Sequence, residues 1–265
     1  MHAGSTPARG TILIKNYHIM IRSLFLLLLI LVGCKTAKVD NEKVIPFATL
    51  YKSGLTLLEQ GKYKKSSEEF SKIFFQHPGS SLTPYAELME AYSLYKDESY
   101  DDAIDVLDVF ISLHPMHEDI AYAYYLKSLC FWNQISGVIY AQGESHEARN
   151  IIEELINRFP LSPYVDDSKI KLKLLYDQIA GQEMEIGRFY LNNKIPIAAI
   201  LRFSTVIKQY PTTRHMPEAL YRMVEGCLIL GMKEEAQKYA QVLEANYKTN
   251  KWNVYLELKY KALTN

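Results

Sequence analysis

The sequence has little of what marks an enzyme or a nucleic-acid-binding protein. It holds only three cysteines among 265 residues, too few for a disulfide framework, and its 30 Lys and Arg are balanced by 30 Asp and Glu. A chain without net charge offers no electrostatic footprint for nucleic acid. It also has no glycine-rich phosphate loop, no nucleophile elbow and no paired-cysteine metal site. We therefore expect no catalysis, no cofactor, no bound metal and no nucleic-acid partner.

One group of side chains could still suggest a metal site. His114, His117, Glu118 and Asp119 surround Pro115. They fall in a predicted turn between helices, where polar side chains are ordinarily solvated or cap the following helix. We interpret them as turn residues, with His117 well placed to cap the helix that starts near residue 118.

Long apolar runs are scarce, and the most extended one lies near the N-terminus. Residues 23–32 carry no charge and follow Arg22, but they fall short of the ~20 residues that span a bilayer. A basic residue before a short apolar core, followed by small residues, is the layout of a secretory signal. The run ends at Cys34 in the letters LVGC, which resemble the lipobox of bacterial lipoproteins.

A lipobox predicts that the chain is cut before Cys34 and that the thiol is acylated. Each buried acyl methylene adds ~0.8 kcal/mol, so several acyl chains on one cysteine anchor a protein firmly. We therefore expect residues 1–33 to be a signal peptide, with a possible true start at Met20, and residues 34–46 to be a tether. An aspartate after the cysteine would resemble a signal for retention in the inner membrane, but the residue there is Lys35. We therefore expect the protein to be anchored at the periplasmic face of the outer membrane. An uncleaved N-terminal anchor with an incidental cysteine is the alternative.

Internal repeats account for most of the remaining chain. Pro78 and Pro115 lie 37 residues apart, and at the same shift two small residues, a tyrosine and two large apolar residues also coincide. This is the order of a tetratricopeptide repeat. It recurs before Pro160 and Pro211, and a fifth copy has Lys248 in the place of the proline. The small residues let paired helices approach closely, and each proline ends a second helix.

The pattern predicts an all-α fold, a tetratricopeptide-repeat superhelix of about five helix pairs. We expect these pairs at residues 47–60 and 63–76, 84–96 and 100–113, 118–134 and 145–158, 182–191 and 195–209, and 214–230 and 233–246. An extra helix at about 163–179 separates the third and fourth pairs. Only residues 252–260, within the tail at 249–265, alternate with a period of two, and this segment can be a strand or a short packing helix.

The first helix of each pair lines the concave surface of such a superhelix. In the first three repeats the inward positions carry five tyrosines and three leucines: Tyr51, Leu55, Leu88, Tyr92, Tyr95, Tyr122, Tyr125 and Leu129. Tyrosine offers an apolar ring and a polar tip at low entropic cost, which suits the binding of an extended peptide. We predict a client-peptide groove here. The alternative is that the rings pack between repeats or onto a returning C-terminal segment.

Three segments of the chain resemble a known family. They are residues 108–117, which lead into the groove positions of the third repeat, residues 158–164 and residues 209–213. They resemble the BamD (YfiO/ComL) lipoproteins of the bacterial β-barrel assembly machinery, and the resemblance extends from Cys34 to about Asn246. It implies that residues 47–160, repeats 1–3, receive the C-terminal segments of unfolded outer-membrane proteins. It also implies that residues 161–248, repeats 4 and 5, dock onto the barrel protein BamA, next to other subunits of the machinery.

One contact follows from the same resemblance. An arginine on the second helix of the fourth repeat matches Arg202 and is expected to pair with an acidic group of BamA. The alternative is an exposed helix charge, worth ~0–1 kcal/mol in a local pair. The segment near residues 135–145 is shorter than the family's insertion, which puts accessory lipoprotein binding there in doubt, and the tail has no counterpart.

Two other classes of protein fit less well. A periplasmic adaptor of the division or Tol-associated kind tends to carry a coiled coil before its repeats, and residues 39–46 are too short for one. An enzyme with a helical-repeat shell, as in lytic transglycosylases, needs a catalytic domain, and about twenty residues after Asn246 cannot form one. We therefore expect a non-catalytic scaffold that assists the assembly and insertion of β-barrel proteins.

Overall fold

The computed structural model describes residues 44–135 and 142–260, and residues from Ile45 onward form one compact unit. The predicted signal peptide, Cys34 and most of the tether lie outside these described residues. Within them, no helix has the length and apolar character needed to cross a membrane.

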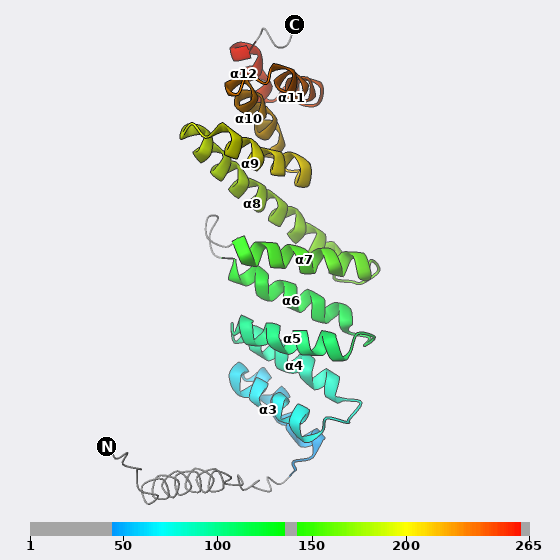
Figure 1. Ribbon diagram of the computed structural model, residues 1–265. Helices are drawn as coiled ribbons and strands as arrows, with labels where there is room; N and C mark the ends of the chain where they lie inside the picture. Colours follow the sequence, from blue (N-terminus) through cyan, green and yellow to red (C-terminus); the bar gives the residue numbers. More distant parts are fainter. Residues whose placement is uncertain (1–43, 136–141, 261–265) are drawn as a thin grey trace, which may run out of the picture. The chain divides into compact units, whose positions relative to one another are not determined.

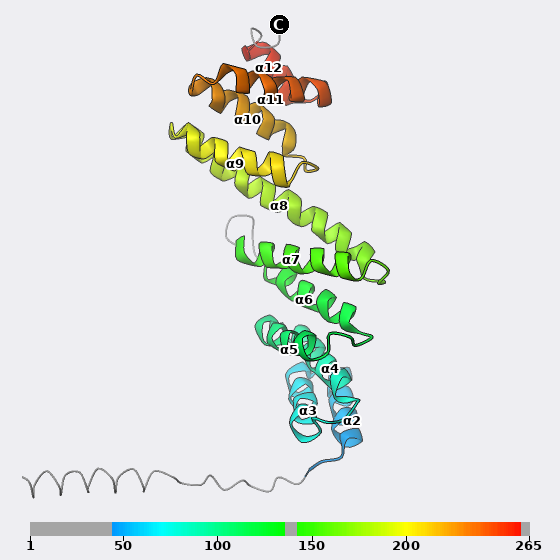
Figure 2. The same ribbon diagram turned by 45° about the vertical axis from the view of Figure 1, so that its right-hand side comes forward.

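The described residues form eleven α-helices and no strand (Figure 1). The helices are α2 (Phe47–Glu59), α3 (Tyr63–Gln76), α4 (Thr83–Lys96), α5 (Tyr100–Leu113), α6 (Ile120–Gln134), α7 (Gln142–Arg158), α8 (Val165–Asn192), α9 (Pro196–Gln209), α10 (Met216–Ile229), α11 (Lys233–Asn246) and α12 (Lys251–Tyr260). From α2 to α12, each helix packs against the next one along the chain (Figure 2). The predicted all-α stack of helix pairs is therefore confirmed.

Small residues let the two helices of a pair approach closely, as the repeat pattern predicts. A Cβ atom added to Gly54 of α2 would lie 2.7 Å from the ring of Phe70 on α3. Gly187 of α8 faces the ring of Phe203 on α9 in the same way. Both rings are at most 1% exposed, so each phenylalanine fills the space that a glycine leaves empty.

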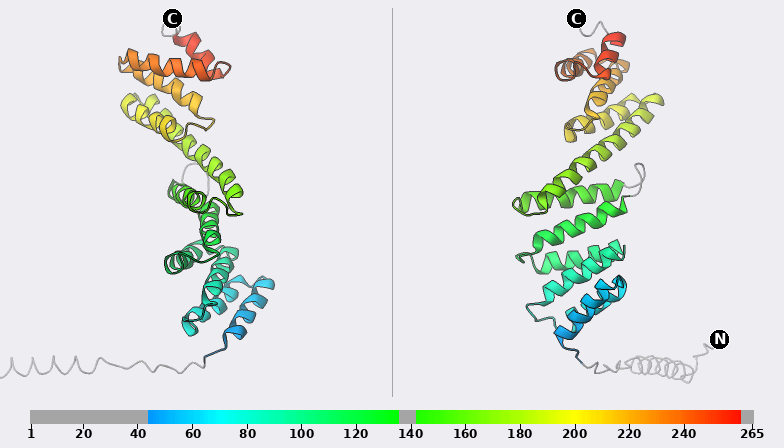
Figure 3. Two further views of the ribbon diagram at one scale, coloured as in Figure 1. Left: turned by 90° about the vertical axis from the view of Figure 1, so that its right-hand side faces the viewer. Right: turned by 180° about the vertical axis from the view of Figure 1, so that it is seen from behind.

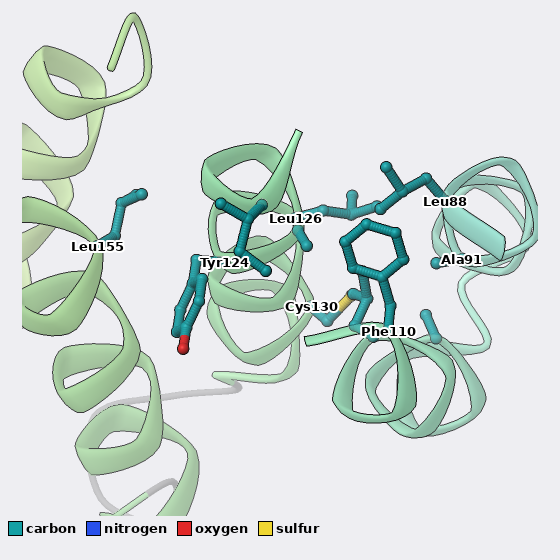
Figure 4. Packing of buried hydrophobic residues seen from close by; sticks show 11 residues of the cluster. Leu88, Ala91, Phe110, Tyr124, Leu126, Cys130 and Leu155 are labelled. Atoms are coloured by element: carbon teal, nitrogen blue, oxygen red, sulfur yellow. The ribbon is translucent and has the colours of Figure 1, made fainter. Parts of the chain in front are cut away.

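One core cluster joins the second repeat to the third. Phe110 of α5 is fully buried next to Leu88 of α4 and Cys130 of α6 (Figure 4). Burial raises the pKa of the Cys130 thiol to about 12. The thiol therefore stays protonated and acts as a small packing group rather than as a nucleophile.

The turns inside four of the repeats share a left-handed residue. Gly61, Glu98, Lys194 and Gly231 have φ angles of 71°, 63°, 61° and 74°, and each lies two residues before the second helix of its pair. Glycine adopts this conformation freely, whereas Glu98 and Lys194 pay a steric penalty.

The predicted extra helix is present, but it is continuous with the first helix of the fourth pair. We expected a break near residue 180, whereas α8 runs unbroken over 28 residues (Figure 3). Gly181 does not end it, because a glycine inside a helix costs only about 1 kcal/mol. Leu175 packs in a cluster with α7, and Met184 packs in a cluster with α9. The single helix thus belongs to the cores of both the third and the fourth repeats.

The alternating tail is the helix α12 rather than a strand. Leu256 is fully buried in the cluster formed with α10 and α11, and the ring of Trp252 lies 5.2 Å from that of Tyr221. The Asn253 side-chain amide donates to the carbonyl of Lys248 at 3.3 Å, inside the preceding turn. The tail folds as a helix because it covers an apolar face that the last repeat would otherwise leave open.

Candidate functional site

The structure divides the predicted client groove into two surfaces. Two of its eight residues lie on α2, four tyrosines from α4 and α6 come together, and two leucines belong to neither group. A fifth ring, which the repeat pattern does not predict, joins the four tyrosines from the turn before α8. We call the group of Tyr92, Tyr95, Tyr122, Tyr125 and Tyr164 the tyrosine cluster.

Tyr164 holds the tyrosine cluster together. Its ring stacks on that of Tyr125, with centroids 4.8 Å apart and planes at 15°, and tilts against that of Tyr122 at 5.6 Å. A cavity of about 460 Å³ opens next to Tyr122 and Tyr164, bounded by the turn between α7 and α8. Two part-buried rings of the cluster, those of Tyr122 and Tyr164, therefore face an open cavity.

The hydroxyl groups of Tyr122 and Tyr125 are uncharged. Burial raises the pKa of the Tyr122 phenol, and the nearby phenols of Tyr92 and Tyr164 raise it further. Burial, together with a hydrogen bond to Asp167, raises the pKa of Tyr125 to about 12. These phenols stay protonated at physiological pH, so the surface offers rings and neutral hydrogen-bonding groups.

Hydrogen bonds fix the orientation of two rings in the cluster. The Tyr125 hydroxyl donates to Oδ2 of Asp167 on α8 at 2.8 Å, and Lys171 donates to the same oxygen at 2.6 Å. The Lys171 ammonium, and then the Tyr125 hydroxyl, hold the pKa of Asp167 below its usual range. The Tyr95 hydroxyl accepts a bond from the side-chain amide of Asn133 at 3.1 Å. The rings are thus oriented before any ligand binds.

Tyr51 and Leu55 line a second, mostly apolar surface. The Tyr51 ring stacks on Phe47 at 5.7 Å and meets the edge of Phe70 at 5.4 Å. The cavity there measures about 530 Å³. We call it the α2 pocket, lined by Phe47, Ala48, Tyr51, Lys52, Leu55, Leu82 and Tyr85.

The two remaining leucines of the predicted groove lie elsewhere. Leu88 is 5% exposed and belongs to the core cluster around Phe110, because the α4 face that carries it turns toward α5 and α6. We therefore leave Leu88 out of the proposed surfaces. Leu129 is part-buried on α6, one residue before the fully buried Cys130.

Arg202 is paired within its own chain. Its guanidinium donates to both carboxylate oxygens of Glu183 on α8, at 3.2 and 3.3 Å. The Arg202 side chain is 42% exposed, whereas that of Glu183 is 13% exposed. On the same helix, Ile197 and Leu201 lie one turn apart and are both exposed. Arg202 therefore retains an open side next to apolar surface while one side contacts Glu183.

Several residues of these surfaces are missed by sequence reasoning, among them Tyr85, Tyr164 and Glu183. Tyr164 lies in a turn and Tyr85 lies one residue after a helix-starting proline, so neither falls on the inward positions of a repeat. Glu183 is 19 residues from Arg202, and only the contact between α8 and α9 makes them partners. A count of tyrosines near the turns would have indicated Tyr85 and Tyr164.

The polar residues around Pro115 act as turn residues. The backbone N–H of Asp119 donates to Nδ1 of His117 at 3.1 Å, immediately before α6 begins at Ile120. Across residues 44–135 and 142–260, no three His, Cys, Asp or Glu side chains gather in a way that could hold a metal ion.

The stacked helix pairs define a repeat protein of the tetratricopeptide class. Residues 45–243 match the YfiO family, described as an outer membrane lipoprotein. The chain is 50% identical over 236 residues to the outer membrane protein assembly factor BamD of Rickettsia prowazekii, covering 89% of this chain and 94% of the relative. It is 38% identical to that of Caulobacter vibrioides, covering 79% and 68%.

The chain therefore belongs to the BamD (YfiO) family of outer membrane lipoproteins, which are non-catalytic assembly factors. Among solved structures it is similar to the MamA protein, with 17% identity, a TM-score of 0.40, and coverage of 81% of this chain and 94% of that one. Because this similarity is low, the fold is assigned from the arrangement of the helices in this chain.

Proposed function

We propose that repeats 1–3, residues 47–160, bind the C-terminal segments of unfolded outer-membrane proteins at the tyrosine cluster and the α2 pocket. Repeats 4 and 5, residues 161–248, dock onto BamA through Arg202 and bring the client to the machinery and its other subunits. Acyl chains on Cys34 hold the protein at the periplasmic face of the outer membrane. The function is binding and positioning, without any chemical step.

The tyrosine cluster carries this proposal. Two of its five part-buried rings, Tyr122 and Tyr164, border an open cavity. Hydrogen bonds to Asp167 and Asn133 set the orientation of two others, Tyr125 and Tyr95. Such a surface can receive the apolar side chains of an extended peptide while its hydroxyls bond to peptide groups. A chain that only needed packing between repeats would have no use for an open cavity at these rings.

A peptide-binding measurement tests the client surface. A fluorescent peptide copied from the last strand of an outer-membrane β-barrel protein is titrated with the protein, and its anisotropy reports binding. Removing one anchoring ring with Tyr164→Ser should cost about 1–2 kcal/mol, a loss of roughly 5–30-fold in affinity. Tyr247→Ser is the matched control, a part-buried tyrosine next to a helix end outside both surfaces. Equal affinity of the two variants would contradict the proposal.

The ion pair of Arg202 allows a sharp test of the BamA contact. Arg202→Gln and Glu183→Gln both break the local pair, but only the first removes the charge that BamA would meet. We expect Arg202→Gln to weaken co-purification with BamA and Glu183→Gln to leave it unchanged or strengthened, because the guanidinium is then free. If the two variants lose BamA equally, Arg202 acts only by joining α8 to α9.

A further inference from the structure

Exposed apolar side chains occupy the tips of the turns between repeats. Met116, between α5 and α6, is 93% exposed, and Leu161, between α7 and α8, is 97% exposed. Each directly follows the proline that ends its repeat. Leu82, between α3 and α4, is exposed as well. Single exposed apolar residues are ordinary on protein surfaces, but Met116 and Leu161 recur at the same place in the second and third repeats. Leu82 lies in the corresponding turn of the first repeat, four residues after Pro78.

These turns lie along one edge of the helix stack, the edge at which the chain enters α2 (Figure 1; Figure 3). We call it the turn edge, formed by residues 77–82, 114–119 and 159–164. The entering chain is fixed there by two hydrogen bonds to the end of α3. The backbone N–H of Ile45 donates to Oε1 of Gln76 at 2.8 Å, and the Ile45 carbonyl accepts from Nε2 of His77 at 2.7 Å.

The tether joins the body at the turn edge, where the chain enters α2. Eleven residues from Cys34 to Ile45 can span at most ~40 Å, so Ile45 cannot lie farther than that from an acylated anchor. The opposite edge, which carries the turns inside the repeats, lies one helix length across the stack from the point of attachment. For a helix of 14 residues such as α3 this is ~21 Å.

We propose that the turn edge rests on the phospholipid surface and that Leu82, Met116 and Leu161 insert into its interfacial layer. The inference rests on the acylation of Cys34 proposed above and is independent of the BamA contact. Leu82 also lines the α2 pocket, and Leu161 lines the cavity next to Tyr164, so lipid and client compete for these two side chains. An anchor that holds the body close to the membrane makes even shallow insertion of a few side chains effective, because the second contact is intramolecular.

The charges on the turn edge indicate an apolar rather than an electrostatic contact. Glu118 and Asp119 lie close to Met116 in the sequence, and no excess of lysine or arginine accompanies the apolar tips of residues 77–82 and 114–119. At the fourth repeat the residue after the proline is Thr212, so the apolar series ends there. The inserted segment therefore covers the first three turns, nearest the tether.

Site-specific fluorescence on the intact lipoprotein tests this orientation. The full chain is reconstituted in vesicles of phosphatidylethanolamine and phosphatidylcholine, with an environment-sensitive dye on Met116→Cys or Leu161→Cys. Matched controls carry the dye at exposed positions of the opposite edge, Gln60→Cys and Asn193→Cys. The natural thiols Cys130 and Cys227 are buried and should not react.

We expect a blue-shifted emission, and quenching by lipids brominated near the headgroup, at positions 116 and 161 but not at 60 and 193. The shift should persist in high salt, because the contact is apolar. A double change Met116→Ser and Leu161→Ser should abolish the quenching of a dye at Leu82→Cys while leaving the helical circular dichroism unchanged.

Three outcomes would overturn the inference. Equal signals from both edges would mean that the body tumbles on its tether, and unshifted emission at positions 116 and 161 would place the turns in water. A blue shift that appears only after purified BamA is added would mean that the turn edge binds a protein rather than lipid. Mass spectrometry of the same samples separates these results from failure of the anchor, since a protein without acyl chains would refute the lipidation of Cys34 as well.

Discussion

Replacing Gly54 by alanine perturbs the contact between the two helices of the first repeat. The added methyl group would lie 2.7–2.9 Å from three atoms of the Phe70 ring, whereas packed carbon atoms prefer ~3.5–4.0 Å. Phe70 is fully buried with Leu50 and Ile73, so the ring has no free space into which it could move.

Two opposing effects set the size of the change. Overpacking costs roughly 1–3 kcal/mol, whereas an alanine in place of a helical glycine gains about 0.5–1 kcal/mol. We expect a net loss of about 1–2 kcal/mol. Because repeats contact only their neighbours, this loss should concentrate in the first repeat. Amide hydrogen exchange in α2 and α3 should accelerate by roughly 5–30-fold, with α10 and α11 unchanged.

Gly143→Ala provides the matched control. Gly143 is an exposed glycine of α7, and a Cβ atom added there meets nothing within 4 Å, so only the helix-propensity gain remains. That variant should exchange as slowly as the parent protein or more slowly. A Gly54→Ala protein whose α2 exchanges no faster than that of the parent would refute the reasoning, since it would show that the Phe70 ring yields without cost.

Three further substitutions test the left-handed backbone positions and a part-buried acid. Glu98→Gly and Lys194→Gly should each raise the free energy of unfolding by ~1 kcal/mol, because both residues are exposed and left-handed; a lower urea midpoint would contradict this. Burial raises the pKa of Glu90 from 4.5 to about 7, so its contribution to stability is complete below pH 4.5 and is lost as the pH rises through 7. Glu90→Gln should therefore flatten the pH dependence and stabilise the fold at pH 8 by up to ~3 kcal/mol in urea titrations, whereas an unchanged pH profile would argue against a buried acid.

The bounds of most helices could be predicted closely, because each repeat contains residues that end its helices or let them pack. The prolines at 78, 115, 160 and 211 and the small residues facing Phe70 and Phe203 recur with the repeat, and they act locally. The continuity of α8 could not be predicted in this way. Whether Gly181 ends a helix depends on the packing of its flanks against α7 and α9, and this packing is a tertiary effect.

The candidate surfaces were only partly predictable. The helical period correctly groups Tyr122 with Tyr125, but it also assigns Leu88 to the groove, since it does not report how α4 is rotated against α5 and α6. Tyr164 completes the tyrosine cluster from a turn, where no period applies. The tail shows the same limit, because its alternation gives no sign that Leu256 packs against two helices.

The unbroken α8 has a mechanical consequence for the proposed binding of a client segment and of BamA. Asp167, which bonds to the tyrosine cluster, and Glu183, which bonds to Arg202, lie on this one helix, 16 residues or ~24 Å apart along its axis. A helix of this length behaves as a stiff rod, so a partner that pulls on one of its ends moves the other by a similar amount. If both proposed contacts form, α8 transmits strain from the bound client segment to the BamA contact at Arg202, without any hinge between them.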